Sequence, residues 1–297
     1  MRTTFSHFRR NIKLFFKDKG LFFTSMITPA ILLVLYATFL GKVYRDSITA
    51  GFPKGSGVPE KLIDGLVGGQ LISSILAVCC VTVAFCSSFL LVQDKAKGVI
   101  KDLTVTPVKP WQLGLGYYLA NLASTLIISF AAAVICFVYL IAVGWYMSAI
   151  DILLLLSDVL ILTLFGTTLA SLINRFLTTE GQISAVGTIV SSGYGFISGA
   201  YMPISSFPEG LRNVISFFPG TYGTSLLRNH AMRGGIAELE KEGIPKEAID
   251  GLRDAMDCNL YFFGTEVPEY VMYLILIGAT LLLGAAYLLV NSKRKKR

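Results

Sequence analysis

Long apolar stretches, separated by shorter polar segments, dominate the pattern of this 297-residue chain. About 20 apolar residues in a helix, at about 1.5 Å each, cover the ~30 Å hydrocarbon core of a bilayer. In that core every backbone N–H and C=O group must be paired within the segment, which favours helices. The pattern therefore predicts an all-α polytopic membrane protein with six transmembrane helices, over residues 21–41, 66–92, 117–143, 150–172, 182–202 and 269–290.

The segment that precedes the first apolar stretch is basic and amphipathic. Aromatic and aliphatic residues recur at helical spacing between residues 5 and 17, and the basic residues lie on another face. Such a helix lies in the plane of the membrane interface with its aromatic side chains at the acyl boundary. We predict an interfacial helix within residues 1–20, a simple basic anchor being the alternative. Its interface residues are Phe8, Arg9, Arg10, Lys13 and Phe16.

Charge is scarce in the rest of the chain and gathers beside the apolar stretches. Hydrophobic residues make up 54% of the sequence and charged residues 15%. Soluble domains typically carry about 25% charged residues, so a soluble fold is excluded and residues 21–297 are assigned to one membrane domain. The net charge of +7 lies next to the predicted spans. We therefore predict membrane lipids, and no nucleic acid, as its partners.

The basic residues also predict the orientation of the chain. Six spans place both termini on one side, where the segments carry 16 Lys and Arg residues, against four in segment 42–65 on the other side. The long 203–268 loop is set aside, because long loops cross the membrane largely regardless of charge. The positive-inside rule then predicts a multi-pass protein of the cell membrane with both termini in the cytoplasm.

The 203–268 loop divides into two parts. Residues 203–234 are semi-apolar and interrupted by prolines, which predicts short re-entrant helices before the last span. Residues 236–257 form a polar insert with seven acidic and three basic residues, which either gates an exit or, as we favour, caps the outer surface. Within the insert, the helical spacing of Ile249, Leu252 and Met256 predicts one helix with an apolar stripe.

Neither the cysteines nor the histidines indicate a metal or disulfide site. Four of the five cysteines fall inside predicted spans, which leaves Cys258 without a partner in the loops. His7 and His230 are the only histidines, and they show no metal-ligand spacing. We expect small apolar fillers at the cysteine positions, and no catalytic residue, metal or cofactor in this chain.

The loop 93–112 is the most informative polar segment. Residues 94–105 can form about three turns of helix, which Pro107 and Pro110 then stop. A short rigid helix across the membrane face can act as a lever between a soluble partner and the adjoining spans. An ordinary solvated loop is an equally good interpretation of the same residues.

At this point the sequence resembles a known family, the permease subunits of type-2 ABC exporters. The resemblance runs along the whole chain and depends on the order of several motifs around six spans. The most specific is SGAYMPISSFPEGLRNVISFFPGTYGTSLLR, residues 198–228, which looks like the family's fifth-span ending and its re-entrant helices. The other motifs are Pro29 in the first span, Lys97-Gly98 with Leu103, Thr106 and Pro107, and Gly116-Tyr117-Tyr118-Leu119-Ala120. The 236–257 insert is longer than the family leads us to expect.

The resemblance implies that two permeases, two copies or paralogues, bind two cytoplasmic ATPase subunits. The chain has no G-x-x-x-x-G-K-[ST] motif, so ATP and Mg²⁺ belong on the separate ATPase. The loop helix becomes a coupling helix in this scheme. Its predicted ATPase-coupling residues are Asp94, Lys95, Lys97, Gly98, Lys101, Asp102, Leu103, Thr106 and Pro107.

Asp158 is the one acidic residue deep within a predicted span. An aspartate at the helix centre costs roughly 2.5–3.5 kcal/mol on insertion scales, so it faces the bundle interior or water. It can serve a pathway or a subunit interface, or it can pair locally with Ser and Thr hydroxyls.

The fifth predicted span is rich in glycine and contains a G-x-x-x-G pattern at 195–199. Small residues allow close helix packing, either at a dimer seam or within one subunit, and the aromatic residues beside them can line a cargo route or form a plain core. The predicted pathway or dimer-interface residues are Asp158, Gly193, Tyr194, Gly195, Gly199 and Tyr201.

Together these features predict the permease subunit of an ATP-driven exporter. Its mostly apolar spans suit a hydrophobic or amphipathic cargo, such as a drug, lipid or peptide, that leaves the cytoplasm or inner leaflet. One alternative is a lipid-linked polysaccharide export permease. The other is an ion-coupled secondary transporter using Asp158, but such transporters usually need several intramembrane carboxylates, and this chain has one. A membrane enzyme would need a polar constellation that the sequence lacks. A structural or sensor subunit would bind the ATPase and move nothing.

Overall fold

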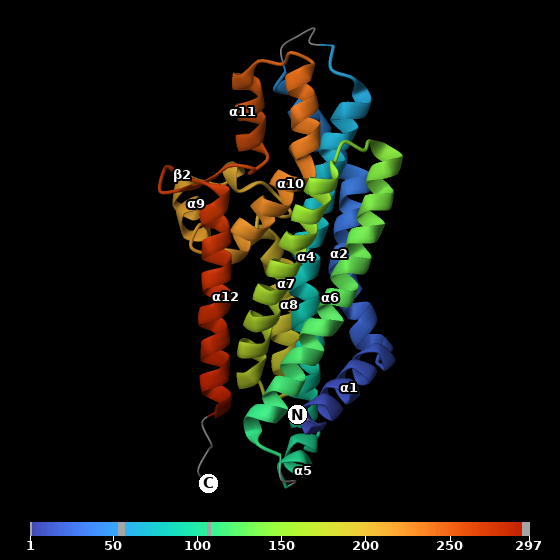
Figure 1. Cartoon of the computed structure of the whole chain (residues 1–297), viewed down its shortest axis with the longest axis vertical. Helices are drawn as coiled ribbons and strands as arrows, with labels where there is room; N and C mark the ends of the chain where they lie inside the picture. The colour runs from blue at the N-terminus through green and yellow to red at the C-terminus, as the bar shows by residue number, and fades with distance from the viewer. Residues whose placement is uncertain (1, 53–56, 106–107, 293–297) are drawn as a thin grey trace.

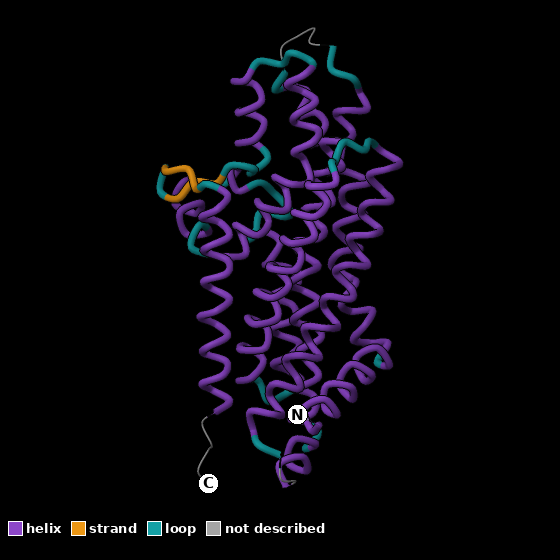
Figure 2. Tube along the Cα trace, in the orientation of Figure 1, coloured by secondary structure: helices purple, strands orange, loops and turns teal. Residues whose placement is uncertain are grey.

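The computed structural model describes residues 2–52, 57–105 and 108–292, which form an elongated helical bundle (Figures 1 and 2). The predicted all-α membrane fold is confirmed. Within this part of the chain, five helices are long and apolar enough to cross a membrane: Lys19–Ala50, Glu60–Ala96, Pro110–Val143, Ala149–Phe176 and Glu269–Ser292.

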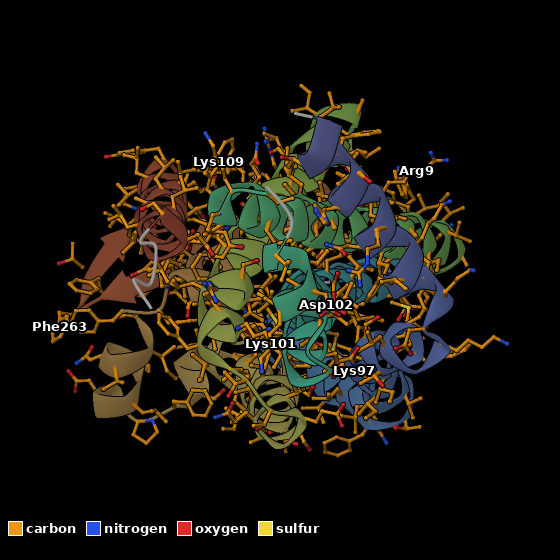
Figure 3. All side chains as sticks on the ribbon, turned by 90° about the horizontal axis from the view of Figure 1, so that it is seen from below. Arg9, Lys97, Lys101, Asp102, Lys109 and Phe263 are labelled. Carbon is orange, nitrogen blue, oxygen red and sulfur yellow. The ribbon has the colours of Figure 1, made fainter. Side chains whose placement is uncertain are left out.

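Two short helices mark the opposite ends of the bundle. Helix α5 (Val99–Val105) lies at one end together with α1 (Arg2–Lys17), which we call the α5 end (Figures 1 and 3). Helix α11 (Lys246–Ala255) lies at the other, which we call the α11 end (Figure 1). The predicted N-terminal helix is present as α1, and it ends where Asp18 caps the next helix.

The first span is longer than predicted. It begins as α2 (Lys19–Leu35), passes through a π-helical turn (Tyr36–Leu40) and continues as α3 (Gly41–Ala50) toward the α11 end. Pro29 lies inside α2 without ending it, because membrane helices tolerate proline where neighbours compensate the lost hydrogen bond. An ion pair between Arg45 and Asp64 then joins α3 to the following helix.

Helix α4 (Glu60–Ala96) is the central element of the bundle. Its 37 residues extend for about 55 Å at 1.5 Å per residue, and 94% of its most apolar 18-residue window is buried inside the protein. It packs against α2 and against α6 (Pro110–Val143), α7 (Ala149–Phe176), α8 (Glu180–Ile197) and α10 (Pro219–Lys241). Because other helices surround α4 on all sides, it has no water-facing side that would require polar residues, and its composition is accordingly apolar along most of its length.

The predicted antiparallel hairpin of the third and fourth spans is present as α6 (Pro110–Val143) and α7 (Ala149–Phe176). Ser148 caps α7 in a reciprocal arrangement with Asp151, whose carboxylate accepts a hydrogen bond from the Ser148 N–H group (2.9 Å). This capping box satisfies backbone donors at the helix start and makes the tight turn possible.

Helix α8 (Glu180–Ile197) corresponds to the predicted fifth span but differs from it. It is not among the five membrane-spanning candidates of the described residues, because glycine, serine, threonine and glutamine reduce its apolar character. It also ends at Ile197 rather than at residue 202. Gly199 adopts the left-handed backbone (φ +74°), which ends a helix without the strain that a side chain would add.

The predicted re-entrant region is only partly made of short helices. A 3₁₀ turn (Ile204–Ser206) and α9 (Glu209–Ile215) are short, whereas α10 (Pro219–Lys241) has 23 residues. A division between re-entrant region and insert near residue 235 is therefore wrong. Helix α10 continues through that point, and its glycine at 234 lies directly against the backbone of the α6–α7 turn, where no side chain would fit.

The polar insert packs onto the core through the predicted stripe. Ile249 and Leu252 of α11, and Met256 just after it, are all buried. A two-stranded antiparallel hairpin follows, which the sequence analysis did not predict, formed by β1 (Leu260–Phe262) and β2 (Thr265–Val267). The last span, α12 (Glu269–Ser292), begins two residues later and leaves most of its surface to lipid.

Candidate functional site

The predicted coupling helix is divided in two at Gly98. Residues 94–96 are the last turn of α4, and the loop helix proper is α5, with seven residues. The prediction of one helix over 94–105 is therefore wrong. Gly98 has φ +79°, a left-handed conformation that breaks the helix where glycine pays no steric penalty. Thr106 and Pro107 lie outside the described residues.

Asp94 fastens three helices together at the α5 end. Its carboxylate is buried and accepts two hydrogen bonds from Arg10 of α1, at 2.8 and 3.3 Å, and one from the Tyr117 hydroxyl of α6. The hydrogen bond to Asp94 raises the pKa of Arg10 above its ordinary value, so the Arg10 guanidinium stays charged. Asp94 is thus a positioning residue that faces inward.

Lys95 also faces the protein rather than a free surface. Its Nζ donates to the carbonyl oxygens of Asn174 (3.2 Å), Arg175 (2.5 Å) and Leu177 (2.8 Å) at the end of α7. A cation at this position satisfies orphan carbonyl groups and complements the negative end of the helix dipole. Arg175 in turn donates from Nε to Asn291 Oδ1 (2.9 Å), which ties α7 to α12.

Helix α5 presents an inner and an outer face. Ile100 and Leu103 pack inward on a cluster formed by α4 and α6. The exposed residues among those predicted to couple are Lys97, Lys101 and Asp102 (Figure 3). Val105, at the end of α5, is 87% exposed, and Trp111 at the start of α6 is 48% exposed. Neither residue was among those predicted to couple, although an apolar residue between two threonines in a polar loop is a usable signal for Val105.

The predicted interfacial residues of α1 divide between its two faces. Arg9, Lys13 and Phe16 are exposed, whereas Phe8 and Arg10 are half-buried. The inner face packs on α6, and a Cβ at Gly116 would lie 3.0 Å from the Cβ of His7. Helix α1 is therefore held against the bundle by close packing, with aromatic and basic side chains left outside as an interfacial helix requires.

A groove of about 770 Å³ lies between α2 and α8, with α4 as its floor. Cys86 and Phe89 of α4 line the floor, and the aromatic rings of Phe196 and Tyr201 lie at the same groove. The α2 side is lined by Leu21, Thr24, Ile27, Thr28, Ile31 and Leu35, and the α8 side by Ile183, Ser184, Gly187, Thr188, Ser191 and Ser192. The surface is mainly apolar and carries no charge.

The two glycines of the G-x-x-x-G pattern are in contact with other residues of the same chain. The Tyr201 ring lies directly against Gly195, and its hydroxyl donates to the Ser191 carbonyl (3.0 Å). Gly199 forms the turn described above, whereas Gly193 has no neighbour within 4 Å of its would-be side chain. Tyr194 is buried and packs edge-on against a phenylalanine that precedes α10. Contact between these residues and a second permease stays a prediction.

Asp158 is fully buried and joins α7 to two other helices. Its Oδ2 lies 2.5 Å from Nδ1 of His230 on α10, and its Oδ1 accepts a hydrogen bond from the Tyr273 hydroxyl of α12. Neither partner was predicted from the sequence, and the alternative of local pairing with Ser and Thr hydroxyls is not the observed arrangement. A usable signal was present in the sequence, because an acidic residue within the membrane usually pairs with another polar group. Of the two histidines in the chain, His230 is the one outside the N-terminal helix.

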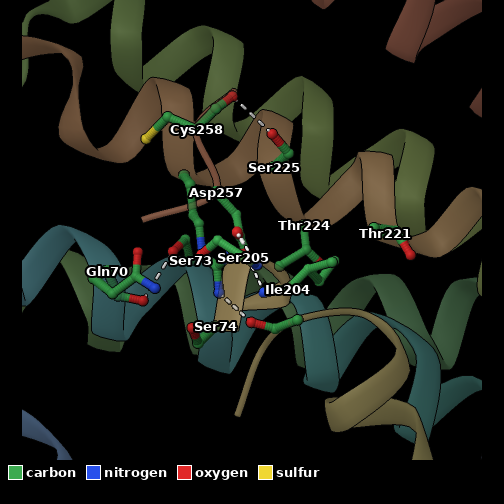
Figure 4. Close-up of polar contacts among 12 residues, drawn as sticks. Gln70, Ser73, Ser74, Ile204, Ser205, Thr221, Thr224, Ser225, Asp257 and Cys258 are labelled. Carbon is green, nitrogen blue, oxygen red and sulfur yellow. Dashed lines mark hydrogen bonds and ion pairs between the residues drawn. The ribbon is translucent and has the colours of Figure 1, made fainter. Parts of the chain in front are cut away.

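A second buried polar cluster connects the insert to the loop after α8 (Figure 4). Asp257 accepts hydrogen bonds from the N–H groups of Ile204 (2.5 Å) and Ser205 (3.0 Å), and its Oδ2 lies 3.1 Å from Nη1 of Arg228. Arg228 also donates to the Gly199 carbonyl oxygen. Burial raises the pKa of Asp257, and the Arg228 guanidinium and the two N–H groups oppose that shift.

The described residues contain no group of histidine, cysteine, aspartate and glutamate side chains that could hold a metal ion. All five cysteines are buried and free, as small apolar fillers are.

The long apolar helices of the described residues define a multi-pass membrane protein. The ABC-2 type transporter family model matches residues 3–231, and the chain belongs to that family. It is a permease of an ABC-type transporter rather than an enzyme, and permeases of this family work with ATPase subunits. No curated protein matches the chain. The match ends within α10, so α11, the hairpin and α12 lie beyond it.

Replacement of Asp158 by alanine should destabilise the bundle, because it leaves the buried His230 and the partly buried Tyr273 hydroxyl without this partner. Each unsatisfied buried polar group costs about 1–3 kcal/mol. We expect a lower melting temperature of the purified protein in detergent. Thr280→Ala is the matched control, since among the described residues its hydroxyl bonds only to its own helix (2.7 Å to Leu276 O). Equal melting temperatures for the two variants would contradict the structural role of Asp158.

Replacement of Asp257 by asparagine should leave Arg228 charged and buried without a counter-ion. Breaking a buried ion pair in this way costs about 3–5 kcal/mol. We expect a clearly lower melting temperature, measured as above. The control is Glu238→Gln, which removes one member of an exposed pair with Lys241 (2.7 Å), and such pairs contribute about 0–1 kcal/mol. A melting temperature of Asp257→Asn at the level of this control would exclude a stabilising pair.

Proposed function

We propose that this permease, together with ATP-hydrolysing subunits, exports a hydrophobic or amphipathic cargo from the cytoplasm or the inner leaflet. The observation that carries the proposal is the continuity of α4. One end of this buried helix leads into α5, and the last third of the helix, through Cys86 and Phe89, forms the floor of the groove between α2 and α8.

The α5 end is assigned to the cytoplasm. Helix α1, helix α5 and the last turn of α12 all lie at that end (Figure 1). Most of the Lys and Arg residues of the short loops belong to the same side, as the positive-inside rule expects of cytoplasmic segments.

The ATPase would contact the outer face of α5. Val105 supplies an apolar contact that folding leaves unused, and the charged residues around it supply a polar rim, as interfaces commonly have. We propose two ATPase subunits, with ATP and Mg²⁺ bound there, and a second permease, either a copy or a paralogue.

Motion at α5 would reach the groove by a short mechanical path. The inner face of α5 is packed on α4 and α6, and Asp94 and Lys95 clamp the end of α4 to α1, α6 and α7. A push on α5 therefore moves α4 as a rigid rod, and the width of the groove changes because α2 and α8 both rest on that rod.

The groove would hold the cargo at the seam between two permeases. Its uncharged, mainly apolar lining suits lipid-like molecules, and the hydroxyls along α8 supply a few polar contacts. Binding sites for small molecules commonly combine an apolar wall with few polar groups.

Replacement of Val105 by aspartate should weaken ATPase binding without loss of folding, because the side chain is almost fully exposed. We expect at least about a tenfold loss of ATPase recovered with the tagged permease from native membranes, equivalent to about 1.4 kcal/mol. The control is Ala50→Asp, an exposed position at the α11 end. Unchanged recovery of ATPase with Val105→Asp would rule out α5 as its docking site.

Replacement of Ser191 by tryptophan should fill the groove and stop transport while the ATPase remains bound. The matched control is Ile189→Trp, on the same helix but 67% exposed and outside the groove lining. The measurement is cargo-stimulated ATP hydrolysis in reconstituted vesicles, with lipids, drugs and peptides tested as cargo. Full stimulation in Ser191→Trp would place the cargo route elsewhere.

A further inference from the structure

A second apolar groove, of about 540 Å³, lies at the start of α12, on the other side of the bundle from α2 (Figure 1). The hairpin and the end of α9 form one wall, with Phe217 and Phe262. The first turns of α12 form the other, with Val271 and Ile275 one helical turn apart. This groove lies largely beyond the residues that match the family and is separate from the one assigned to cargo.

An exposed aromatic cluster closes the outer end of this groove. The rings of Phe217, Phe262 and Phe263 lie 4.9–5.9 Å apart, and their side chains are 68%, 38% and 58% exposed. Phe263 projects from the edge of the bundle (Figure 3). The hairpin turn at Phe263 and Gly264 has positive φ at both residues, a tight geometry that holds the rings in place.

The position of the cluster identifies what covers it. The hairpin ends two residues before a membrane span, so the groove lies at the boundary between headgroups and acyl chains. Aromatic residues concentrate at that depth of the membrane. Below the groove α12 continues as a lipid-facing surface, with Leu274, Leu281 and Leu282 each at least 65% exposed. The groove is thus continuous with the membrane-facing surface of the span.

The rim of the groove also carries a charge preference. Glu266 lines it, and no ion pair to Glu266 is present among the described residues. Glu269 follows at the start of α12. An acidic rim attracts an ammonium headgroup and repels a net negative one.

We propose that this groove binds a zwitterionic phospholipid of the leaflet at the α11 end, with an acyl chain along Val271 and Ile275 and an ammonium headgroup near Glu266. The bound lipid would stabilise the hairpin against α12. The proposal depends on the membrane fold and is independent of the cargo, the ATPase and the direction of transport.

The test uses tryptophan fluorescence in a Trp111→Phe, Trp145→Phe background, which removes both native tryptophans. Phe262→Trp places a probe beside the acyl chain in the groove. Tyr261→Trp places one outside the groove lining, next to its strand partner Glu266 at the rim and away from the acyl chain, because side chains alternate along a strand. In vesicles of dibrominated phosphatidylcholine we expect Phe262→Trp to lose much of its fluorescence and Tyr261→Trp to lose little. Equal quenching of the two probes would overturn the proposal.

A groove-filling variant separates a bound lipid from simple contact with the bilayer. Adding Val271→Phe should reduce the quenching of Phe262→Trp, whereas Leu274→Phe, on the exposed side of the same helix, should leave it unchanged. The melting temperatures of both variants serve to confirm folding. Undiminished quenching with Val271→Phe would overturn the proposal. Equal quenching by dibrominated phosphatidylglycerol would overturn its headgroup assignment.

Discussion

Close packing around the buried helix α4 is the constraint on which the rest of the structure depends. Lipid tails are as apolar as leucine, so helices in a membrane associate through tight van der Waals contact rather than through exclusion of water. Small residues supply that contact here. A Cβ at Gly69 of α4 would lie 3.0 Å from the backbone of α10, and one at Gly166 of α7 would lie 2.9 Å from the backbone of α4. These close approaches hold α4 as a rod between its neighbours.

Buried charges then determine how the outer elements are joined to this centre. Asp94 connects α4 to α1 and α6, and Asp158 connects α7 to α10 and α12. The Arg228–Asp257 pair connects α10 to the insert and to the loop after α8. A buried charge without a partner is costly in a low dielectric, so each of these groups specifies a particular arrangement of three segments.

The family-matched region and the rest of the chain are structurally interdependent. Residues 3–231 contain α5, α4 and the groove between α2 and α8, which together form the proposed transport machinery. The C-terminal region supplies partners for buried groups of that machinery: Asp257 pairs with Arg228, and Tyr273 hydrogen-bonds Asp158. It also brings the aromatic hairpin and α12, between which lies the groove proposed to bind lipid. Transport and attachment to lipid are thus assigned to opposite sides of one bundle.

The sequence by itself determined the membrane fold, the amphipathic α1, the α6–α7 hairpin and the apolar stripe of α11, because apolar length and helical period are local properties. Gly98 and Pro29 stand out in the sequence as motif residues. The split of the 94–105 helix and the early end of α8, however, follow from the left-handed backbone angles of Gly98 and Gly199, and a glycine in a sequence does not reveal whether it adopts such an angle. Only the tertiary structure decided which partners the buried charges have. His230 and Tyr273 lie 72 and 115 positions from Asp158 along the chain, and no local pattern links residues so far apart. The two apolar grooves likewise arise between segments distant in sequence, so packing alone creates them.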